Sequence, residues 1–276
     1  MSDLASTHQE FNPAHLSPQK LHALLLGGVA PRPIAFASTI DKEGRVNLAP
    51  FSYFNVFSAN PPVVIFSPAR RGKDNTTKHT LDNVLEVPEV VINMVDYDLV
   101  HACSLASTDY PQGVNEFKKS GLTEVPSVTI APPRVLESPV SMECHVLKVE
   151  SFGPNPGAGN LVFCEIKRMH FRHNVLGSDG LPDAVLLDLV ARCGGSYYAR
   201  VSSDALFEIP KPVVNLGIGV DAIPEEIRTS SILTGKHLAM LGNVECLPDE
   251  TEVNDYKLIE LSEIFIDYSD SGVVLE

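Results

Sequence analysis

Residues 31–83 read PRPIAFASTIDKEGRVNLAPFSYFNVFSANPPVVIFSPARRGKDNTTKHTLDN, and this stretch decides the fold. Apolar and small or hydroxyl-bearing side chains alternate with a period of two over residues 34–40, and residues 41–44 read DKEG, which is good turn chemistry. The pattern predicts a β-hairpin whose return strand covers residues 45–51. Pro50 lies in that return strand and cannot donate to a ladder, so the strand is expected at a sheet edge or a bulge.

The second half of the stretch predicts a small-molecule pocket. Residues 52–58 place hydroxyls and an amide on a framework of aromatic side chains, and residues 63–67 form a β-branched run. A basic, Thr-rich segment then leads into helical spacing, with Asn75, Thr76 and Thr77 as N-cap choices. A helix N-terminus presents free N–H groups to an anion, so this segment could hold a phosphate. An ordinary solvated helix start is the alternative interpretation.

Composition narrows the class of protein without selecting an activity. The 276 residues are 44% hydrophobic, which suffices for one large β domain or two small ones. A formal net charge of −14 argues against nucleic acid as a partner, so any phosphate site must be a local basic patch. No apolar run is long enough for a membrane span, and residues 1–19 lack the pattern of a secretory signal. Five widely spaced cysteines without a CxxC pair favour reduced thiols and a cytoplasmic location.

The remaining elements are predicted from capping residues and periodicity. They are a helix over 18–28 capped by Ser17, a strand over 89–95, a helix over 96–105 capped by Asp96, a short helix over 115–121, and long strands over 135–149 and 161–170. Beyond about residue 205 an extended connector is expected at 209–212, followed by helical spacing or short strands at 233–248 and 258–265.

Several blocks resemble one known family in the same order along the chain. They are PRPIAFAST, NLAPFSYFN, VIFSP, KHTLDN, VVINMV, YPQGVNEFKKSGLT, PPRVLESPVSMEC and ARCGGSYYARV. Together they cover about residues 20–205 and resemble the flavin reductase-like family, which has the FMN-binding split-barrel fold. The resemblance implies a mainly β (α+β) protein: a six-stranded antiparallel split β-barrel with flanking helices over residues 1–205. Residues 206–276 would be a C-terminal extension that packs on the barrel or the dimer.

The resemblance also implies the binding residues and the partners. It implies FMN rather than FAD, NADH or NADPH as co-substrate, and a homodimer with the flavin near the subunit interface. The implied flavin contacts, by position in the family blocks, are Ser38, Thr39, Asn47, Leu48, Ala49, Pro50, Ser52, Asn55, Phe66 and Ser67 for the ring and ribityl chain, Arg70, Arg71, Thr77, Lys78 and Thr80 for the phosphate, and Arg192 near the ring. Lys73-Asp74 and Lys78-His79-Thr80 both match the phosphate motif of the family in part, so the choice of lysine stays open.

The activity implied is that of an NAD(P)H:flavin reductase supplying reduced flavin, with a flavin-dependent monooxygenase or a redox protein as partner. Two alternatives stay open: a flavoredoxin-like electron-transfer module, and a flavin-dependent enzyme with its own organic substrate. The catalytic residues stay unassigned because the cofactors carry hydride transfer themselves. By position in the family blocks, Arg192 and Tyr198 would lie nearest the flavin of either subunit, and a salt bridge and a core aromatic contact are their alternative roles.

Two other patterns are not used in this interpretation. Gly217, Gly219 and Ala222 satisfy G-x-G-x-x-A, but Pro224 follows and no βαβ unit surrounds them, so a loop is predicted there. Cys164, His170 and His173 have metal-binding side chains, yet side chains spread along strands would not obviously converge.

Overall fold

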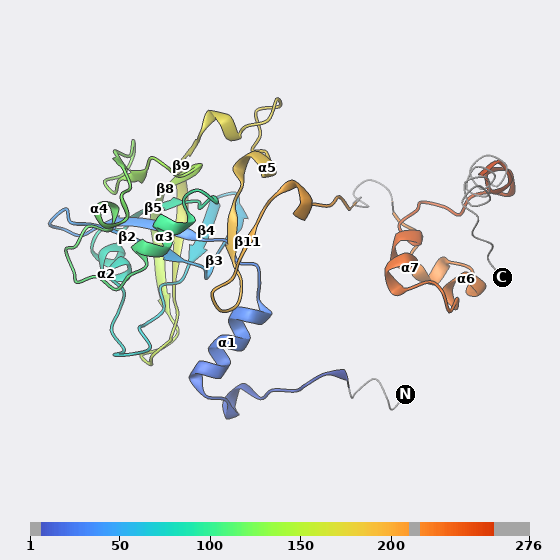
Figure 1. Ribbon diagram of the computed structural model, residues 1–276, viewed down its shortest axis with the longest axis horizontal. Helices are drawn as coiled ribbons and strands as arrows, with labels where there is room; N and C mark the ends of the chain where they lie inside the picture. The colour runs from blue at the N-terminus through green and yellow to red at the C-terminus, as the bar shows by residue number, and fades with distance from the viewer. Residues whose placement is uncertain (1–6, 210–215, 257–276) are drawn as a thin grey trace, which may run out of the picture. The chain divides into compact units, whose positions relative to one another are not determined.

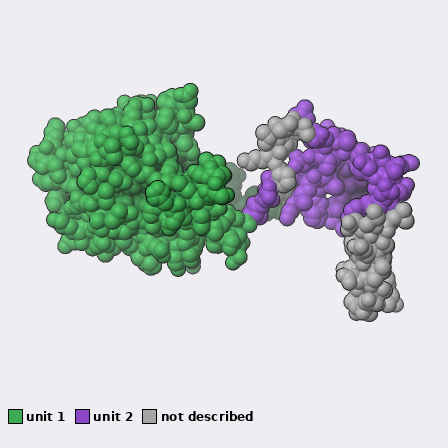
Figure 2. Space-filling view, turned by 90° about the horizontal axis from the view of Figure 1, so that it is seen from above, with its two compact units in different colours: residues 1–206 green, residues 207–276 purple. Residues whose placement is uncertain are grey.

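The computed structural model describes residues 7–209 and 216–256, which belong to two compact units, residues 1–206 and residues 207–276 (Figure 2). Within the described residues, none of the helices has the length and apolarity that a bilayer crossing requires.

The first unit is built on a seven-stranded antiparallel sheet (Figure 1). Its strands are β1 (Ala35–Ile40), β2 (Val46–Phe51), β3 (Phe54–Ala59), β4 (Pro62–Phe66), β5 (Glu89–Asn93), β8 (Val140–Ser151) and β9 (Asn160–Phe171). They lie in the order β2-β1-β5-β8-β9-β4-β3. The predicted strands over 89–95, 135–149 and 161–170 are thus confirmed, with the middle one beginning at Val140 because residues 136–139 leave the ladder.

The predicted N-terminal hairpin is confirmed. β1 and β2 pair from Ala35 opposite Phe51 to Ile40 opposite Val46. The turn is closed by Asp41, whose Oδ1 accepts the N–H groups of Glu43 and Arg45. β2 is an edge strand, as Pro50 predicted, and its outward Leu48 N–H donates to the buried Glu116 carboxylate at 2.9 Å.

The order of the strands explains the split of the barrel. β2 and β3 are the two edges of the sheet, yet only residues 52 and 53 join them along the chain. The sheet therefore curves until its edges approach at this connection, and backbone groups of both edges are left available there. The family resemblance implied six strands, whereas this sheet contains seven.

Helices flank the sheet near β1 and β2. α2 (His79–Glu86) packs on both strands, and α3 (Val100–Ala106) and α4 (Glu116–Ser120) pack on β2 and on each other (Figure 1). α1 (Pro18–Gly28) and α4 confirm predicted helices, capped by the side chains of Ser17 and Asn115. The helix predicted from residue 96 begins later, because Asp96 uses its Oδ1 to accept the Leu99 N–H in the preceding turn.

Two apolar clusters form the core. One lies among the barrel strands and α2 and includes Phe66, Ile92 and Met142, all buried. The other joins β1 and β2 to α3 and α4 through Phe36, Leu48 and Phe117. The unit also contains β6 (Glu124–Val125), β7 (Arg134–Val135), α5 (Ala184–Leu187), β10 (Val190–Arg192) and β11 (Tyr198–Arg200).

The described part of the second unit contains α6 (Glu225–Arg228) and α7 (Gly235–Leu241), so helical spacing within 233–248 is confirmed. The glycines of the G-x-G-x-x-A pattern serve a close backbone approach. Ile218 N–H donates to Val244 O and Gly219 N–H to Gly242 O, and a Cβ at residue 217 would lie 2.7 Å from Gly242 O. The segments 210–212 and 258–265 lie outside the described residues.

Candidate functional site

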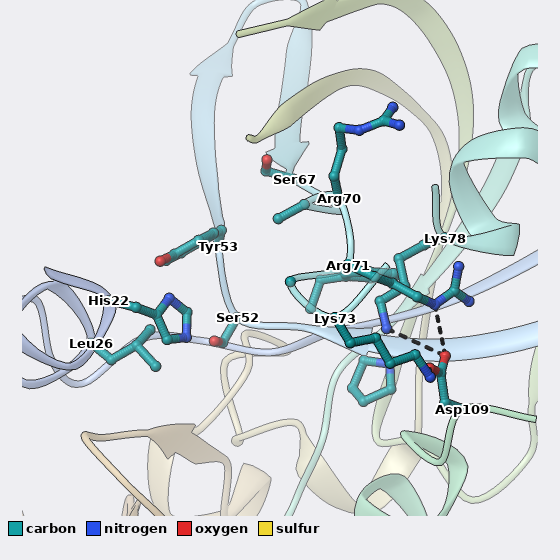
Figure 3. A pocket seen from close by; sticks show the side chains of 14 residues that line it. His22, Leu26, Ser52, Tyr53, Ser67, Arg70, Arg71, Lys73, Lys78 and Asp109 are labelled. Carbon is teal, nitrogen blue, oxygen red and sulfur yellow. Dashed lines mark hydrogen bonds and ion pairs between the residues drawn. The ribbon is translucent and has the colours of Figure 1, made fainter. Parts of the chain in front are cut away.

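A pocket opens where the two edges of the sheet meet. Its volume is ≈ 490 Å³, within the range of small-molecule sites. The walls come from α1, the end of β2, the β2–β3 connection, the segment after β4 and the start of α2 (Figure 3). The lining residues are His22, Leu26, Pro50, Phe51, Ser52, Tyr53, Ser67, Ala69, Arg70, Arg71, Gly72, Lys73, Lys78 and Asp109.

One end of the pocket is a cluster of charges, here called the cation cluster: Arg71, Lys73, Lys78 and Asp109. Asp109 Oδ1 lies 2.8 Å from Arg71 Nε and 3.8 Å from Lys78 Nζ, and Oδ2 lies 2.5 Å from Lys73 Nζ (Figure 3). Hydrogen bonds from Lys73 and Arg71 hold the pKa of Asp109 far below its usual range. Burial lowers the pKa of Lys78, and Asp109 opposes that shift. The cluster therefore has a cationic excess suited to an anion.

The segment that carries the cation cluster is fixed by its own hydrogen bonds. Arg71 Nη1 donates to Thr77 O and to Thr76 Oγ1, so the guanidinium is held from behind. Arg70 turns away from Asp109 and bonds to Asn75 (Figure 3). The Arg70 backbone joins the β8–β9 connection through Ala158 O and Gly157 N–H. Side-chain donors at the cluster are thereby presented on an ordered loop.

The start of α2 adds backbone donors beside this cluster. The N-cap is Lys78, which offers no capping side chain, so none of the predicted caps at 75–77 holds that position. Thr77 instead donates its hydroxyl to Asp82 Oδ1 at 2.7 Å. The first-turn N–H groups of α2 thus receive no side-chain cap from residue 78 and add to the positive end of the pocket.

The other end of the pocket is lined by hydroxyl and apolar groups. Ser67 donates its N–H to Tyr53 O at 2.9 Å, which ties the end of β4 to the β2–β3 connection. Ser67 Oγ accepts the Asn160 N–H, and Gly159 leaves room for it, since a Cβ there would lie 2.9 Å from Oγ. Arg32 bonds to the Leu26 and Val29 carbonyls and to Ser52 Oγ, so it fixes the end of α1 beside this wall.

Comparisons with known proteins show which family the chain belongs to. The model of the flavin reductase-like domain matches residues 27–189. An uncharacterised protein from Halalkalibacterium halodurans is 36% identical over 75% of this chain and 98% of its own length. The chain belongs to the flavin reductase-like family.

Two solved structures share the split-barrel fold. Nitrilotriacetate monooxygenase component B from Bacillus cereus is 30% identical, with a TM-score of 0.68 over 73% of this chain and 98% of its own. The 2-nitrobenzoate 2-nitroreductase NbaA from Pseudomonas fluorescens is 28% identical, with a TM-score of 0.65 over 73% of this chain and 96% of its own. Family and neighbours together support a flavin-related oxidoreductase function.

The donor set of the pocket fits a flavin phosphate ester. A flat, largely apolar ring with polar edges needs hydroxyls beside apolar walls, and a phosphate needs clustered cations; the two ends of the pocket supply them. Of the residues that the family resemblance suggested, the structure brings six into this pocket: Pro50, Ser52, Ser67, Arg70, Arg71 and Lys78.

Three more of the suggested residues lie in an adjoining crevice. Asn47, Ala49 and Thr80 line it together with Arg71, Lys78 and Asp109, so the cation cluster is the wall between the crevice and the pocket. The Asn47 amide donates to Thr80 Oγ1 at 2.8 Å. Thr77 contributes its carbonyl to Arg71 rather than a hydroxyl to the pocket.

The other suggested residues lie away from the pocket, for reasons of sheet position. Ser38 and Thr39 are fully buried because β1 is an inner strand covered on both faces; Thr39 Oγ1 accepts from Asn83. Leu48 and Phe66 are likewise core residues. The remaining two are Asn55, exposed on β3, and Arg192, whose guanidinium stacks on Tyr198 at 4.6 Å.

Seven lining residues were missed from the sequence: His22, Leu26, Phe51, Tyr53, Ala69, Gly72 and Asp109. His22 and Leu26 are four residues apart on α1 and share one face of that helix, a signal that periodicity offered. Tyr53 lies inside the polar stretch already singled out. Asp109 follows α3, thirty-one residues beyond Lys78, and no local pattern connects the two.

Proposed function

We propose that this protein is an NAD(P)H:flavin oxidoreductase that binds FMN in the pocket between the two sheet edges. The observation that carries the proposal is the pairing of a cation cluster with a hydroxyl-lined apolar wall in a pocket of ≈ 490 Å³. Arg71, Lys73, Lys78 and the start of α2 would bind the phosphate, and Ser52, Ser67 and Pro50 would contact the ring and ribityl chain. A bound flavin would accept a hydride from a nicotinamide and pass the two electrons onward.

The roles of the chain's own residues follow from their places. The ring edge would receive hydrogen bonds from Ser52 and Ser67, which hold it in register with the apolar wall. His22, Leu26 and Tyr53 line the same wall and would bound the space where a nicotinamide or another substrate approaches.

A visible spectrum of the purified, undialysed protein tests whether it binds FMN. Oxidation of NADH and of NADPH with added FMN tests whether it is a reductase. We expect FMN, identified by mass after release, and turnover with one or both nucleotides. A yellow protein without nicotinamide oxidation would reject the reductase and favour a flavoredoxin-like electron carrier. A chain that binds no flavin would reject the proposal as a whole.

The likeness to NbaA favours a second candidate, a reductase that acts on its own organic substrate. The likeness to component B of a monooxygenase favours delivery of reduced flavin to an oxygenase. Anaerobic reoxidation separates them: a nitroaromatic substrate would reoxidise protein-bound flavin directly in the first case. In the second case, reduced FMN would leave the protein, and gel filtration would recover it in the small-molecule fraction.

The proposed assembly is a homodimer. β3 is an edge strand that exposes 64% of Val56 and 63% of Phe57, apolar surface that a second copy of the chain could cover. Light scattering on the eluting protein would give twice the mass of one chain. A Phe57→Asp variant is expected to shift that mass to the monomer, and a mass of one chain for the unaltered protein would contradict the assembly.

A further inference from the structure

We propose that Asp109 is a built-in competitor of the flavin phosphate, which makes FMN an exchanging ligand rather than a permanently held group. The inference rests on the proposed function, because it assigns the phosphate to the cation cluster. It concerns a residue that lies outside the segment where the family resemblance places the phosphate contacts.

The first step is the position of the carboxylate. Asp109 follows α3 and reaches across to cations of the segment after β4 and of the start of α2. Oδ1 accepts from Arg71 Nε at 2.8 Å and Oδ2 from Lys73 Nζ at 2.5 Å. Lys78 Nζ lies farther away, 3.8 Å from Oδ1. Asp109 thus occupies donor directions that a phosphate oxygen requires.

The second step is the balance of charge. Three cations and one carboxylate leave the cation cluster with an excess of two positive charges. A phosphate monoester carries about −1.5 to −2 at neutral pH. The ester could be neutralised while Asp109 stays, but its oxygens would then stand beside a like charge and share the same donors. Binding must therefore either displace the carboxylate or accept its repulsion.

The third step asks whether Asp109 competes with the phosphate or instead holds the cations in place. If Asp109 held the cations in place, its removal would loosen the cation cluster. Arg71, however, is held by Thr77 O and Thr76 Oγ1, neither of which depends on Asp109. Lys78 is the N-cap of α2, so the helix sets the position of its backbone, and its side chain is 35% exposed. The Asp109 side chain is 34% exposed and can turn toward water when an anion arrives.

The consequence is an effect on flavin affinity that depends on the phosphate group alone. Riboflavin has the same ring and ribityl chain as FMN but no phosphate, so Asp109 would leave its affinity unchanged. For FMN the carboxylate would weaken binding and speed release, which suits a protein that hands reduced flavin to a partner. The effect would shrink at high salt, because the cation cluster is partly exposed.

The test compares Asp109→Asn with unaltered protein in titrations of flavin fluorescence, using FMN and riboflavin at low and at 0.5 M salt, and in stopped-flow release of FMN. We expect the variant to bind FMN about three- to tenfold more tightly at low salt, with slower release and unchanged riboflavin affinity. Glu150→Gln, a change at an exposed position on β8, is the matched control. Asp109→Ala repeats the test if the first variant is unstable by circular dichroism.

The outcomes are distinguishable. Weaker or equal FMN binding by both Asp109 variants would overturn the inference and make Asp109 a support for the cations. Unaltered protein that binds FMN no more tightly than riboflavin would also overturn it, while leaving flavin binding intact. Protein that binds neither flavin would refute the proposed function itself.

Discussion

At the scale of single residues, the geometry bears on which lysine of the phosphate motif, Lys73 or Lys78, binds the phosphate. Lys73 and Lys78 both lie against Asp109, so the two partial matches in the sequence converge on one place. Lys73 has a side chain that is 65% exposed, whereas that of Lys78 is 35% exposed and stands at the N-cap of α2. A less hydrated cation binds an anion more strongly, so Lys78 should dominate.

We therefore expect Lys78→Ala to raise the Kd for FMN by roughly ten- to a hundredfold, which is the value of a charge-assisted hydrogen bond. Lys73→Ala should raise it less. Riboflavin affinity should be the same in all variants, and Lys167→Ala, an exposed lysine on β9 paired with Glu165, is the control. Fluorescence titration gives each value. A larger loss from Lys73→Ala would show that the exposed lysine carries the contact.

At the scale of elements, the sequence predicted what is local. The period of two and the DKEG turn predicted the β1–β2 hairpin, and Ser17 and Asn115 predicted two helix starts. The burial of Ser38 could not be predicted in this way. Periodicity shows that β1 has two faces, but only tertiary packing shows that both are covered, since Ala37 packs in the cluster that includes α2 and Phe36 in the cluster that includes α3 and α4. The same holds for Asp109, which reaches the cation cluster through tertiary packing alone.

A second element-scale feature is the buried Glu143 on β8, which fastens the segment before β7. Its carboxylate accepts from Val128 N–H, Thr129 N–H, Thr129 Oγ1 and His170. Burial raises the pKa of Glu143, but the hydrogen bonds from Thr129 and Val128 outweigh it and lower the pKa to about 2. The ordinary value is 4.5.

A carboxyl whose pKa is lower in the folded state contributes stability above its unfolded pKa and loses it as pH falls. The contribution of Glu143 should thus be complete above about pH 5 and disappear between about pH 4.5 and 2. Glu143→Gln should lower the free energy of unfolding by about 1–3 kcal/mol at pH 7, since the amide cannot accept every donor.

Urea unfolding at several pH values measures this difference, with Glu150→Gln on the same strand as an exposed control. The gap between unaltered protein and Glu143→Gln should narrow steadily below pH 4.5. A gap that stays constant down to pH 2 would mean that the carboxylate is not what the loop donors require.

At the scale of the whole molecule, the chain divides into a family domain and a segment that the family model does not reach. The model ends at residue 189, and the first unit ends at Leu206. Residues 207–276 contain 14 Asp and Glu residues against 4 Lys and Arg residues, so they carry most of the net charge of −14. Within the described residues, the pocket, the cation cluster and both apolar clusters consist of first-unit residues alone.

We therefore expect a chain ending at Leu206 to fold and to bind FMN with an unchanged Kd, because every described lining residue lies before that point. Its melting temperature should stay within a few degrees of the full chain's, and its isoelectric point should rise as the acidic residues are lost. Differential scanning fluorimetry, flavin titration and isoelectric focusing measure these three quantities, and light scattering gives the mass of the assembly. A loss of flavin affinity with an intact fold would assign the extension a part in the site, and a change from dimer to monomer would assign it a part in assembly.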